Sequence, residues 1–192
     1  MPRPISITKE RILDAAYKKV ERSGGGSLTI RGLGDELGCS TQPIFSSFQS
    51  LEGLQKAVKE KAASSFKKYV NFPLKGFPPL KSIGLRYIRF ASKEPHLFHL
   101  LFEGDDGVSY LDGDKLLTAD PKILEIVMRE TGLSKDDCGL LYLENWIFAH
   151  GLAVMIVNKS LLFDEKNISR MLSDVYQGTL ERFLNQERGG KI

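Results

Sequence analysis

The sequence contains little cysteine and lacks a long uninterrupted apolar run. Its 192 residues include only two cysteines, Cys39 and Cys138, which lie far apart. That spacing excludes a disulfide framework or a zinc knuckle and favours a reducing, cytoplasmic environment. No run approaches the roughly 20 apolar residues of a membrane-spanning helix. Residues 1–6 lack the apolar core of a secretory signal. We therefore expect a cytoplasmic protein without a membrane partner.

The common signatures of catalysis are also missing from the chain. It contains no Walker pattern, no Gly-x-Gly-x-x-Gly after a strand and no Gly-x-Ser-x-Gly. No stretch alternates convincingly at period two between turn residues, so we predict no sheet. Hydrophobic residues make up 42% and charged residues 27%, as in an ordinary globular domain. These features favour an all-α protein that is not an enzyme and needs no cofactor.

Charge is divided unevenly along the chain. Residues 1–70 carry 12 basic and 7 acidic side chains, whereas residues 71–192 carry 15 basic and 17 acidic ones. A basic N-terminal third predicts a polyanionic partner for that part, although lysine-rich solvated helix faces give the same count. Prolines and glycines interrupt the pattern at residues 71–79. We therefore predict two domains, residues 1–70 and residues 71–192.

Apolar periodicity and capping residues predict helices on both sides of this break. Thr8, Thr29, Ser40, Ser50, Asp120, Ser134 and Asp164 are the expected N-terminal caps. The expected helices cover residues 8–22, 30–37, 41–47, 51–70, 80–93, 95–102, 121–131, 134–158 and 164–186. The ranges that begin at 8, 134 and 164 include the capping residue. Residues 104–120 are acidic and contain glycine, so we expect a loop with at most one short helix there.

Residues 29–48 contain the parts of a helix-turn-helix. Gly38 follows the first short helix where a left-handed residue is needed, and Gly34 allows the second helix to approach closely. A shared apolar seam is expected from Ile30, Leu33, Leu37, Ile44 and Phe48. Such a pair presents the N-terminal turn of its second helix to the DNA major groove. The turn alone fits an ordinary helical hairpin equally well.

Residues 8–58 resemble the N-terminal DNA-binding domain of the TetR (tetracycline-repressor) family of transcriptional regulators. The matching stretches are residues 11–16, 28–31, 37–40 and 44–54. This resemblance implies a one-component regulator, typically a repressor, whose partner is double-stranded operator DNA. It also implies an all-α fold, in which an N-terminal three-helix helix-turn-helix domain precedes a larger C-terminal helical domain for ligand binding and dimerisation.

The resemblance also assigns positions that face DNA. They are Thr29, Arg31, Ser40, Thr41, Gln42, Phe45, Ser46 and Ser47. Thr29 and Arg31 are expected to touch phosphate or an adjacent base. Gln42 has the amide group that bonds adenine in a bidentate manner, and the methyl group of Thr41 suits thymine.

The sequence departs from the family pattern at several of these positions. Phe45 replaces the usual tyrosine, Ser46 and Ser47 replace a basic residue and a histidine, and Leu51 replaces a lysine. Because DNA affinity depends largely on neutralised phosphates, binding would then depend on Arg3, Lys9, Arg11 and Lys56. The alternative is a helical regulatory module that no longer binds DNA and acts through protein partners.

Aromatic and sulfur-containing side chains gather in the C-terminal two thirds. The candidate ligand-binding residues are Tyr87, Phe90, Phe98, Phe102, Met128, Tyr142, Trp146 and His150. They suit a pocket for a small apolar effector of unknown identity, or else they form the core. Trp146, His150 and Gly151 resemble an arrangement found in the ligand domain of some TetR subfamilies.

Two further patterns lie in this region. His96, His99 and Glu103 have a spacing that could bind zinc, but no fourth ligand is evident, so a small metalloprotein is the weaker alternative and we predict no metal. The last two predicted helices carry more apolar residues than one buried stripe requires. That surplus predicts an isologous homodimer with a four-helix interface. A dimer would place two recognition helices about 34–36 Å apart, one turn of DNA.

Overall fold

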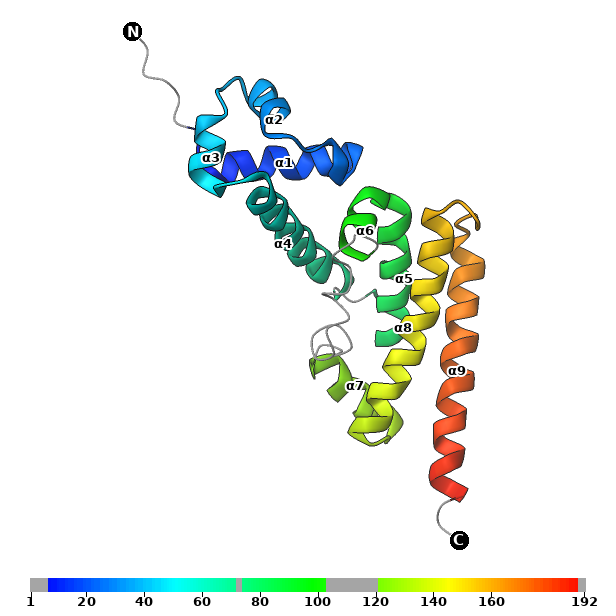
Figure 1. The fold of residues 1–192 in the computed structure, drawn as a ribbon. Helices are drawn as coiled ribbons and strands as arrows, with labels where there is room; N and C mark the ends of the chain where they lie inside the picture. Colours follow the sequence, from blue (N-terminus) through cyan, green and yellow to red (C-terminus); the bar gives the residue numbers. More distant parts are fainter. Residues whose placement is uncertain (1–6, 72–73, 103–120, 190–192) are drawn as a thin grey trace. The chain divides into compact units, whose positions relative to one another are not determined.

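The computed structural model describes residues 7–71, 74–102 and 121–189, and all regular structure in these ranges is helical (Figure 1). The elements in chain order are α1 (Lys9–Ser23), the short 3-10 helix η1 (Gly25–Ser27), α2 (Ile30–Leu37), α3 (Gln42–Phe48), α4 (Leu51–Val70), α5 (Pro79–Lys93), α6 (Pro95–Phe102), α7 (Pro121–Thr131), α8 (Lys135–Val157) and α9 (Glu165–Gly189). The predicted all-α fold class is confirmed. The predicted loop at residues 104–120 and the predicted cap Asp120 lie outside the described residues.

The helix starts follow the local capping chemistry. The hydroxyl oxygens of Thr8, Thr29, Ser50 and Ser134 each accept the backbone N–H three residues further on, at 3.0–3.2 Å. Asp164 likewise accepts the backbone N–H groups of Lys166 and Asn167. Each of these bonds satisfies an N–H group that has no partner within the helix.

The prediction that Ser40 caps the third helix is wrong. Thr41 occupies the cap position of α3, and its side chain makes no capping hydrogen bond. The backbone of Thr41 is already helical (φ −71°, ψ −17°) rather than extended as at a capped start, and its carbonyl accepts the N–H of Ile44 at 3.2 Å. η1 was not predicted; it forms within the glycine-rich link after α1.

By its contacts the chain divides into two compact units. Among the described residues, the N-terminal unit covers residues 7–66 and 96–102, which contain α1, η1, α2, α3, most of α4 and nearly all of α6. The C-terminal bundle comprises α5, α7, α8, α9 and the end of α4. A Cβ atom on Gly24 would lie 3.4 Å from the His96 ring, so the glycine link gives α6 a close approach. The predicted assignment of DNA binding to residues 1–70 and of ligand binding and dimerisation to residues 71–192 stays a prediction.

Aliphatic side chains form most of the core of the N-terminal unit. The buried ones are Ile12, Ala16, Val20, Leu28, Leu33, Ile44, Leu54, Val58, Ala62, Leu97 and Leu101, with the aromatic side chains Phe48 and Phe98 beside them. Ion pairs join the helices around this core. Glu36 on α2 accepts from Lys19 at 3.2 Å and Arg22 at 2.8 Å, both on α1. The hydrogen bond from Lys19 is the main reason why the pKa of Glu36 lies below its ordinary value.

In the C-terminal bundle, α5 packs against α8 and α9. Buried Leu80, Val127, Leu133, Cys138, Leu141 and Phe183 form one cluster at the α7 end. Polar pairs also connect the helices. Arg89 on α5 donates to both carboxylate oxygens of Glu165 on α9, at 3.0 and 2.5 Å. The amide of Asn145 donates to Thr179 at 3.2 Å.

Helix α8 is, within the described residues, the one helix long and apolar enough to cross a membrane by length and composition. Glu144, Asn145 and His150 interrupt the apolar run, so the sequence pattern predicted no membrane span here. Core helices of soluble proteins meet the same criterion, so the observation is weak evidence for a membrane span. Here these three residues bind Arg182, Thr179 and Tyr87 respectively. Their pairing is that of a helix packed inside a bundle.

Candidate nucleic-acid interface and bundle pocket

Helices α2 and α3 meet through a tight turn that depends on two glycines. Gly38 ends α2 in the left-handed conformation with φ 66°, which favours glycine. The N–H of Cys39 then donates to the carbonyl of Gly34 at 3.0 Å. A Cβ atom on Gly34 would lie 2.9 Å from the carbonyl oxygen of Cys39. The close approach predicted for Gly34 and the positive φ predicted for Gly38 are both confirmed.

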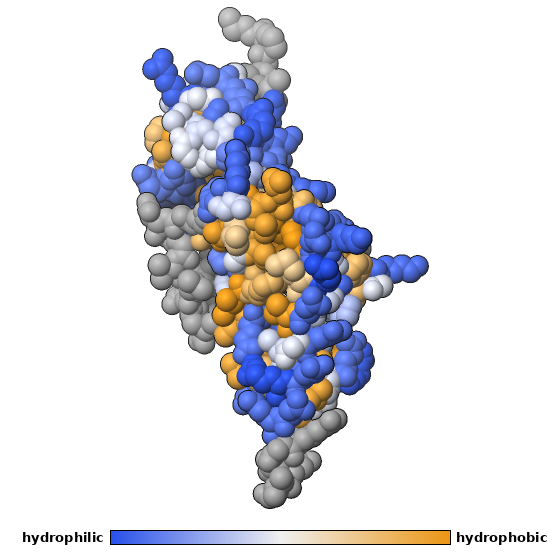
Figure 2. Space-filling view, turned by 90° about the vertical axis from the view of Figure 1, so that its right-hand side faces the viewer, coloured by the Kyte–Doolittle hydropathy of each residue, from blue (hydrophilic) through white to orange (hydrophobic). Residues whose placement is uncertain are grey.

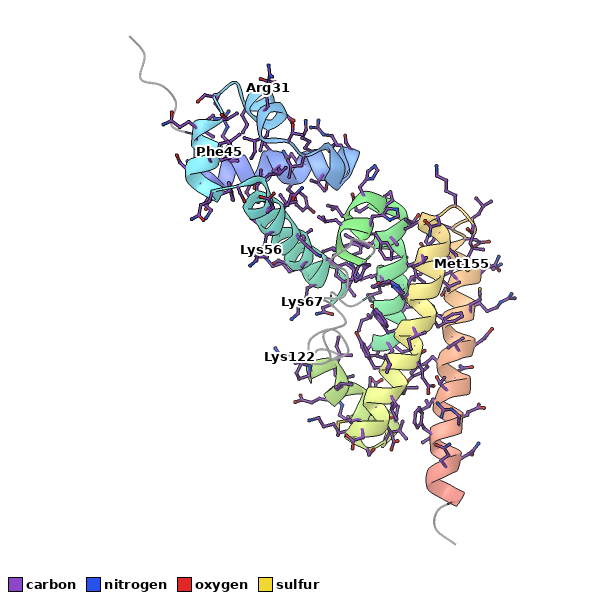
Figure 3. The ribbon with its side chains drawn as sticks, in the orientation of Figure 1. Arg31, Phe45, Lys56, Lys67, Lys122 and Met155 are labelled. Carbon is purple, nitrogen blue, oxygen red and sulfur yellow. The ribbon has the colours of Figure 1, made fainter. Side chains whose placement is uncertain are left out.

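The outward side of α3 is polar or aromatic and uncharged. Ile44 and Phe48 are buried against the core, whereas Gln42, Phe45 and Ser46 are exposed. Ser40 and Thr41, just before the helix, are exposed as well. Figure 3 shows Phe45 on α3. This side has groups suited to base edges but no cation for phosphates.

Two of the predicted DNA-facing hydroxyls already have partners within the fold. The hydroxyl of Thr29 caps α2, as described above. Ser47 is half-buried, and its hydroxyl donates to the carbonyl of Pro43 at 2.8 Å. Both hydroxyl groups therefore already make a hydrogen bond to the backbone of their own helix.

The cations of this unit lie outside α3. Arg31 on α2, Lys9 and Arg11 on α1, and Lys56 on α4 are all exposed, and Figure 3 shows Arg31 and Lys56. Arg3 lies outside the described residues. Among the described residues, the cations that can neutralise phosphates therefore lie on the helices that flank α3.

The start of α4 is less favourable for phosphate than the family pattern would suggest. Leu51 is half-buried and Glu52 occupies the first turn. A backbone N–H of the first turn, that of Glu52 itself, lowers the pKa of its carboxyl group, and Ser50 adds to the effect. An ionised carboxylate therefore already occupies this helix end, where a phosphate would otherwise bind.

Four of the eight predicted ligand-binding residues come together in the C-terminal bundle. Tyr87 and His150 are joined by a 2.8 Å hydrogen bond between the tyrosine hydroxyl and Nδ1. Trp146 stacks on His150 with ring centroids 5.0 Å apart. A pocket borders this cluster, lined by Leu80, Lys81, Ile83, Gly84, Tyr87, Tyr142, Asn145, Trp146, Ala149 and Leu172.

Side chains largely fill this pocket. Its free volume is ≈ 20 Å³, about what one water molecule requires. Burial raises the pKa of the Tyr142 hydroxyl, which borders the pocket. The lining residues Lys81 and Asn145 were not singled out from the sequence. Asn145 carried a usable signal, since it is a polar residue beside Trp146 in a strongly apolar helix.

The other four predicted ligand-binding residues lie elsewhere. Phe98 and Phe102 belong to the N-terminal unit, where their ring centroids are 4.9 Å apart. Phe90 lies 6.2 Å from the ring of Tyr69. Met128 packs on the cluster around Val127. In this structure these four side chains make packing contacts and do not line the pocket.

The structure offers no support for the metal alternative. Within the described ranges no group of three or more His, Cys, Asp or Glu side chains is placed to hold a metal ion. His96 lies against Gly24, as noted above. Glu103, the third member of the predicted set, lies outside the described residues.

Comparisons with known proteins agree with this architecture. No family model matches the chain. It is 35% identical over 57 residues to an uncharacterized HTH-type transcriptional regulator from Mycobacterium tuberculosis. That match covers 30% of this chain and 26% of the relative, so it spans about a quarter of the relative's length.

Solved structures match over most of the chain. A TetR-like transcriptional regulator from Rhodococcus sp. RHA1 aligns with TM-score 0.62 and 14% identity, covering 94% of this chain and 98% of the other. A member of the TetR family from Streptomyces coelicolor A3 aligns with TM-score 0.57 and 16% identity, covering 90% and 98% respectively. A putative transcriptional regulator from Pseudomonas aeruginosa PAO1 aligns with TM-score 0.62 and 16% identity, covering 91% and 93%. The chain therefore has the fold of the TetR-like regulators.

Proposed function

We propose that this protein is a cytoplasmic transcriptional regulator, a repressor, which binds operator DNA as a homodimer and responds to a small effector. The observation that carries the proposal is the uncharged, exposed side of α3 in a helix-turn-helix. Gln42 and Thr41 are the reading residues, for adenine and for a thymine methyl group respectively. Arg31, Lys9 and Lys56 supply phosphate contacts from the flanking helices.

The dimer is supported by an apolar stripe on α8. Leu140, Ile147 and Met155 are 50%, 56% and 45% exposed. Their spacing of seven and eight residues puts them on one side of the helix. The pocket residues Tyr142 and Trp146 lie on the opposite side, so α8 carries large apolar side chains on two sides, although one buried stripe would suffice within the bundle. Figure 2 shows a broad apolar patch on this face of the bundle.

A second copy of the same chain is the occupant that the proposal assigns to this stripe, because an isologous contact pairs one apolar surface with itself. Replacing Ile147 by glutamate buries a charge in that contact, so we expect the dimer to dissociate in sedimentation experiments. Lys166→Glu, an exposed change on α9 away from the stripe, is the matched control and leaves the dimer intact. A variant Ile147→Glu that sediments as the wild type would contradict the assigned interface.

The effector site is the pocket beside Tyr87, Tyr142 and Trp146. Its lining is mainly aromatic and aliphatic, with Lys81 and Asn145 as polar groups. That composition suits a small, mostly apolar molecule. Because the pocket is nearly filled, an effector must displace side chains to enter. It then acts only through a difference in affinity between the DNA-binding and released states.

Selection of duplexes from a random pool with the full-length protein tests the proposal. We expect an inverted repeat whose half-sites lie about one turn of DNA apart, and an affinity that falls steeply as salt rises. Selection of no duplex at low salt would overturn the proposal. It would favour instead a module acting through protein partners, for which the uncharged positions Ser46, Ser47 and Leu51 are the supporting observation.

A further inference from the structure

Phe45 is exposed where the fold does not require an aromatic residue. It is 48% exposed, while Ile44 and Phe48 of the same short helix are buried and supply its contact with the core. Ser46 and Gln42 share the exposed side of α3 with Phe45, at helical spacings of one and three residues. A large apolar side chain in that setting contributes little to folding. One exposed apolar residue is ordinary by itself, but the position of Phe45 beside the proposed reading residue Gln42 puts its ring where bound DNA would lie.

The chemistry of the phenylalanine ring restricts that contact. The ring has no hydrogen-bonding group and no charge, so it cannot recognise a phosphate or a base heteroatom. The apolar group that a base presents in the major groove is the C5-methyl group of thymine. A tyrosine at this position would bring a hydroxyl that could bind phosphate, and this chain lacks it.

The neighbouring side chains favour the same base pairs. The exposed residues around Phe45 are Thr41, Gln42 and Ser46, and none is an arginine or lysine that could bind guanine in a bidentate manner. Gln42 lies one turn earlier, about 4.5 Å along the helix axis. The rise of one base pair is roughly 3.4 Å, so these two side chains can reach adjacent base pairs.

We propose that the ring of Phe45 packs on the C5-methyl group of one thymine in each operator half-site and thereby favours thymine at that position. The inference rests on the proposed function and adds the base that this residue specifies. The ring acts as a specificity determinant, because a cytosine or a purine at that place offers no methyl group.

The test uses the duplex selected by the full-length protein. Each thymine is replaced in turn by deoxyuridine, which removes only the C5-methyl group. We expect one thymine per half-site at which this change weakens wild-type binding about fourfold, corresponding to about 0.8 kcal/mol for one buried carbon group. In Phe45→Ala the same replacement should change the Kd by less than about twofold, because the two changes remove one shared contact.

Lys166→Ala is the control, since it alters an exposed residue of α9 in the bundle and should keep the fourfold sensitivity. If Phe45→Ala melts well below the wild type, Phe45→Gln replaces it in the same measurement. The inference is overturned if no methyl group matters to the wild type, or if the Phe45 variants keep the wild-type sensitivity. Failure to select any duplex is a different outcome, because it overturns the proposed function itself and not only the role of Phe45.

Discussion

The N-terminal unit and the C-terminal bundle differ in what their described surfaces expose. Both bury aliphatic and aromatic side chains, such as Leu33 and Phe98 in the N-terminal unit and Leu141 and Tyr87 in the bundle. Apart from Phe45, the N-terminal unit exposes polar side chains such as Gln42 and several cations, whereas the bundle exposes the apolar side chains Leu140 and Ile147 on α8. A polar, basic surface suits a hydrated polyanion, whereas an apolar surface suits another protein chain. The difference fits the partners proposed above for the two units.

The largest effect should come from the core of the N-terminal unit. Leu33 is fully buried, so Leu33→Ala should lower the free energy of unfolding by about 2–5 kcal/mol. The matched control in the bundle is Leu140→Ala, where half the residue is already exposed and the isolated chain should lose much less. Denaturant unfolding of both variants, at concentrations where the protein is monomeric, measures the difference. Equal losses would break the contrast between the two surfaces.

A single type of substitution should have opposite signs in the two units. In Gly34→Ala the new Cβ meets the carbonyl oxygen of Cys39 at 2.9 Å, so the turn must shift, at a cost of about 1–3 kcal/mol. At Gly139 on α8 a Cβ meets nothing within 4 Å. Gly139→Ala should therefore stabilise the monomer by up to about 1 kcal/mol, through helix propensity alone. Thermal unfolding of both variants would show whether the signs differ.

The smallest predicted effect concerns pH and the α5–α9 pair in the bundle. The hydrogen bond from Arg89 holds the pKa of Glu165 below its ordinary value of 4.5. Because the folded pKa is lowered, the stabilisation is complete above that ordinary value and is lost as pH falls through the folded pKa. The pair is partly exposed, so its contribution is about 0.2–1 kcal/mol.

Glu165→Gln removes this contribution. The wild type should be the more stable protein at neutral pH, and the gap should close on acidification. If the stability difference between wild type and Glu165→Gln is the same at all pH values, the effect comes from packing and not from the charge of Glu165. The measurement is a series of denaturant titrations between neutral and acidic pH.

Local chemistry accounts for what could be predicted from the sequence. Thr8, Thr29 and Ser134 cap helices through hydrogen bonds to the backbone N–H three residues further on. Gly38 ends α2 because it adopts the left-handed backbone conformation. Such features need no knowledge of distant residues. The helix boundaries and the helix-turn-helix were therefore accessible from the sequence pattern.

Tertiary contacts account for what could not be predicted. Tyr87 and His150 form a hydrogen bond across 63 positions, while Phe98 and Phe102, equally aromatic, pack in the other unit. The residue type alone does not separate a pocket residue from a core residue. The membership of α6 in the N-terminal unit likewise depends on the glycine link at Gly24, which the sequence pattern indicated only as a helix end.

The central claim is that α3 of the N-terminal unit reads the operator, and competition between two duplexes tests it most directly. The Kd of the wild type, Gln42→Ala and Lys166→Ala is measured on the selected duplex and on a scrambled duplex at one salt concentration. We predict that Gln42→Ala binds the selected duplex about 5- to 150-fold more weakly, or about 1–3 kcal/mol for one lost base contact, with little change on the scrambled duplex. Lys166→Ala, in the bundle, should match the wild type on both. Selected-duplex binding by Gln42→Ala as tight as that of the wild type would contradict the account.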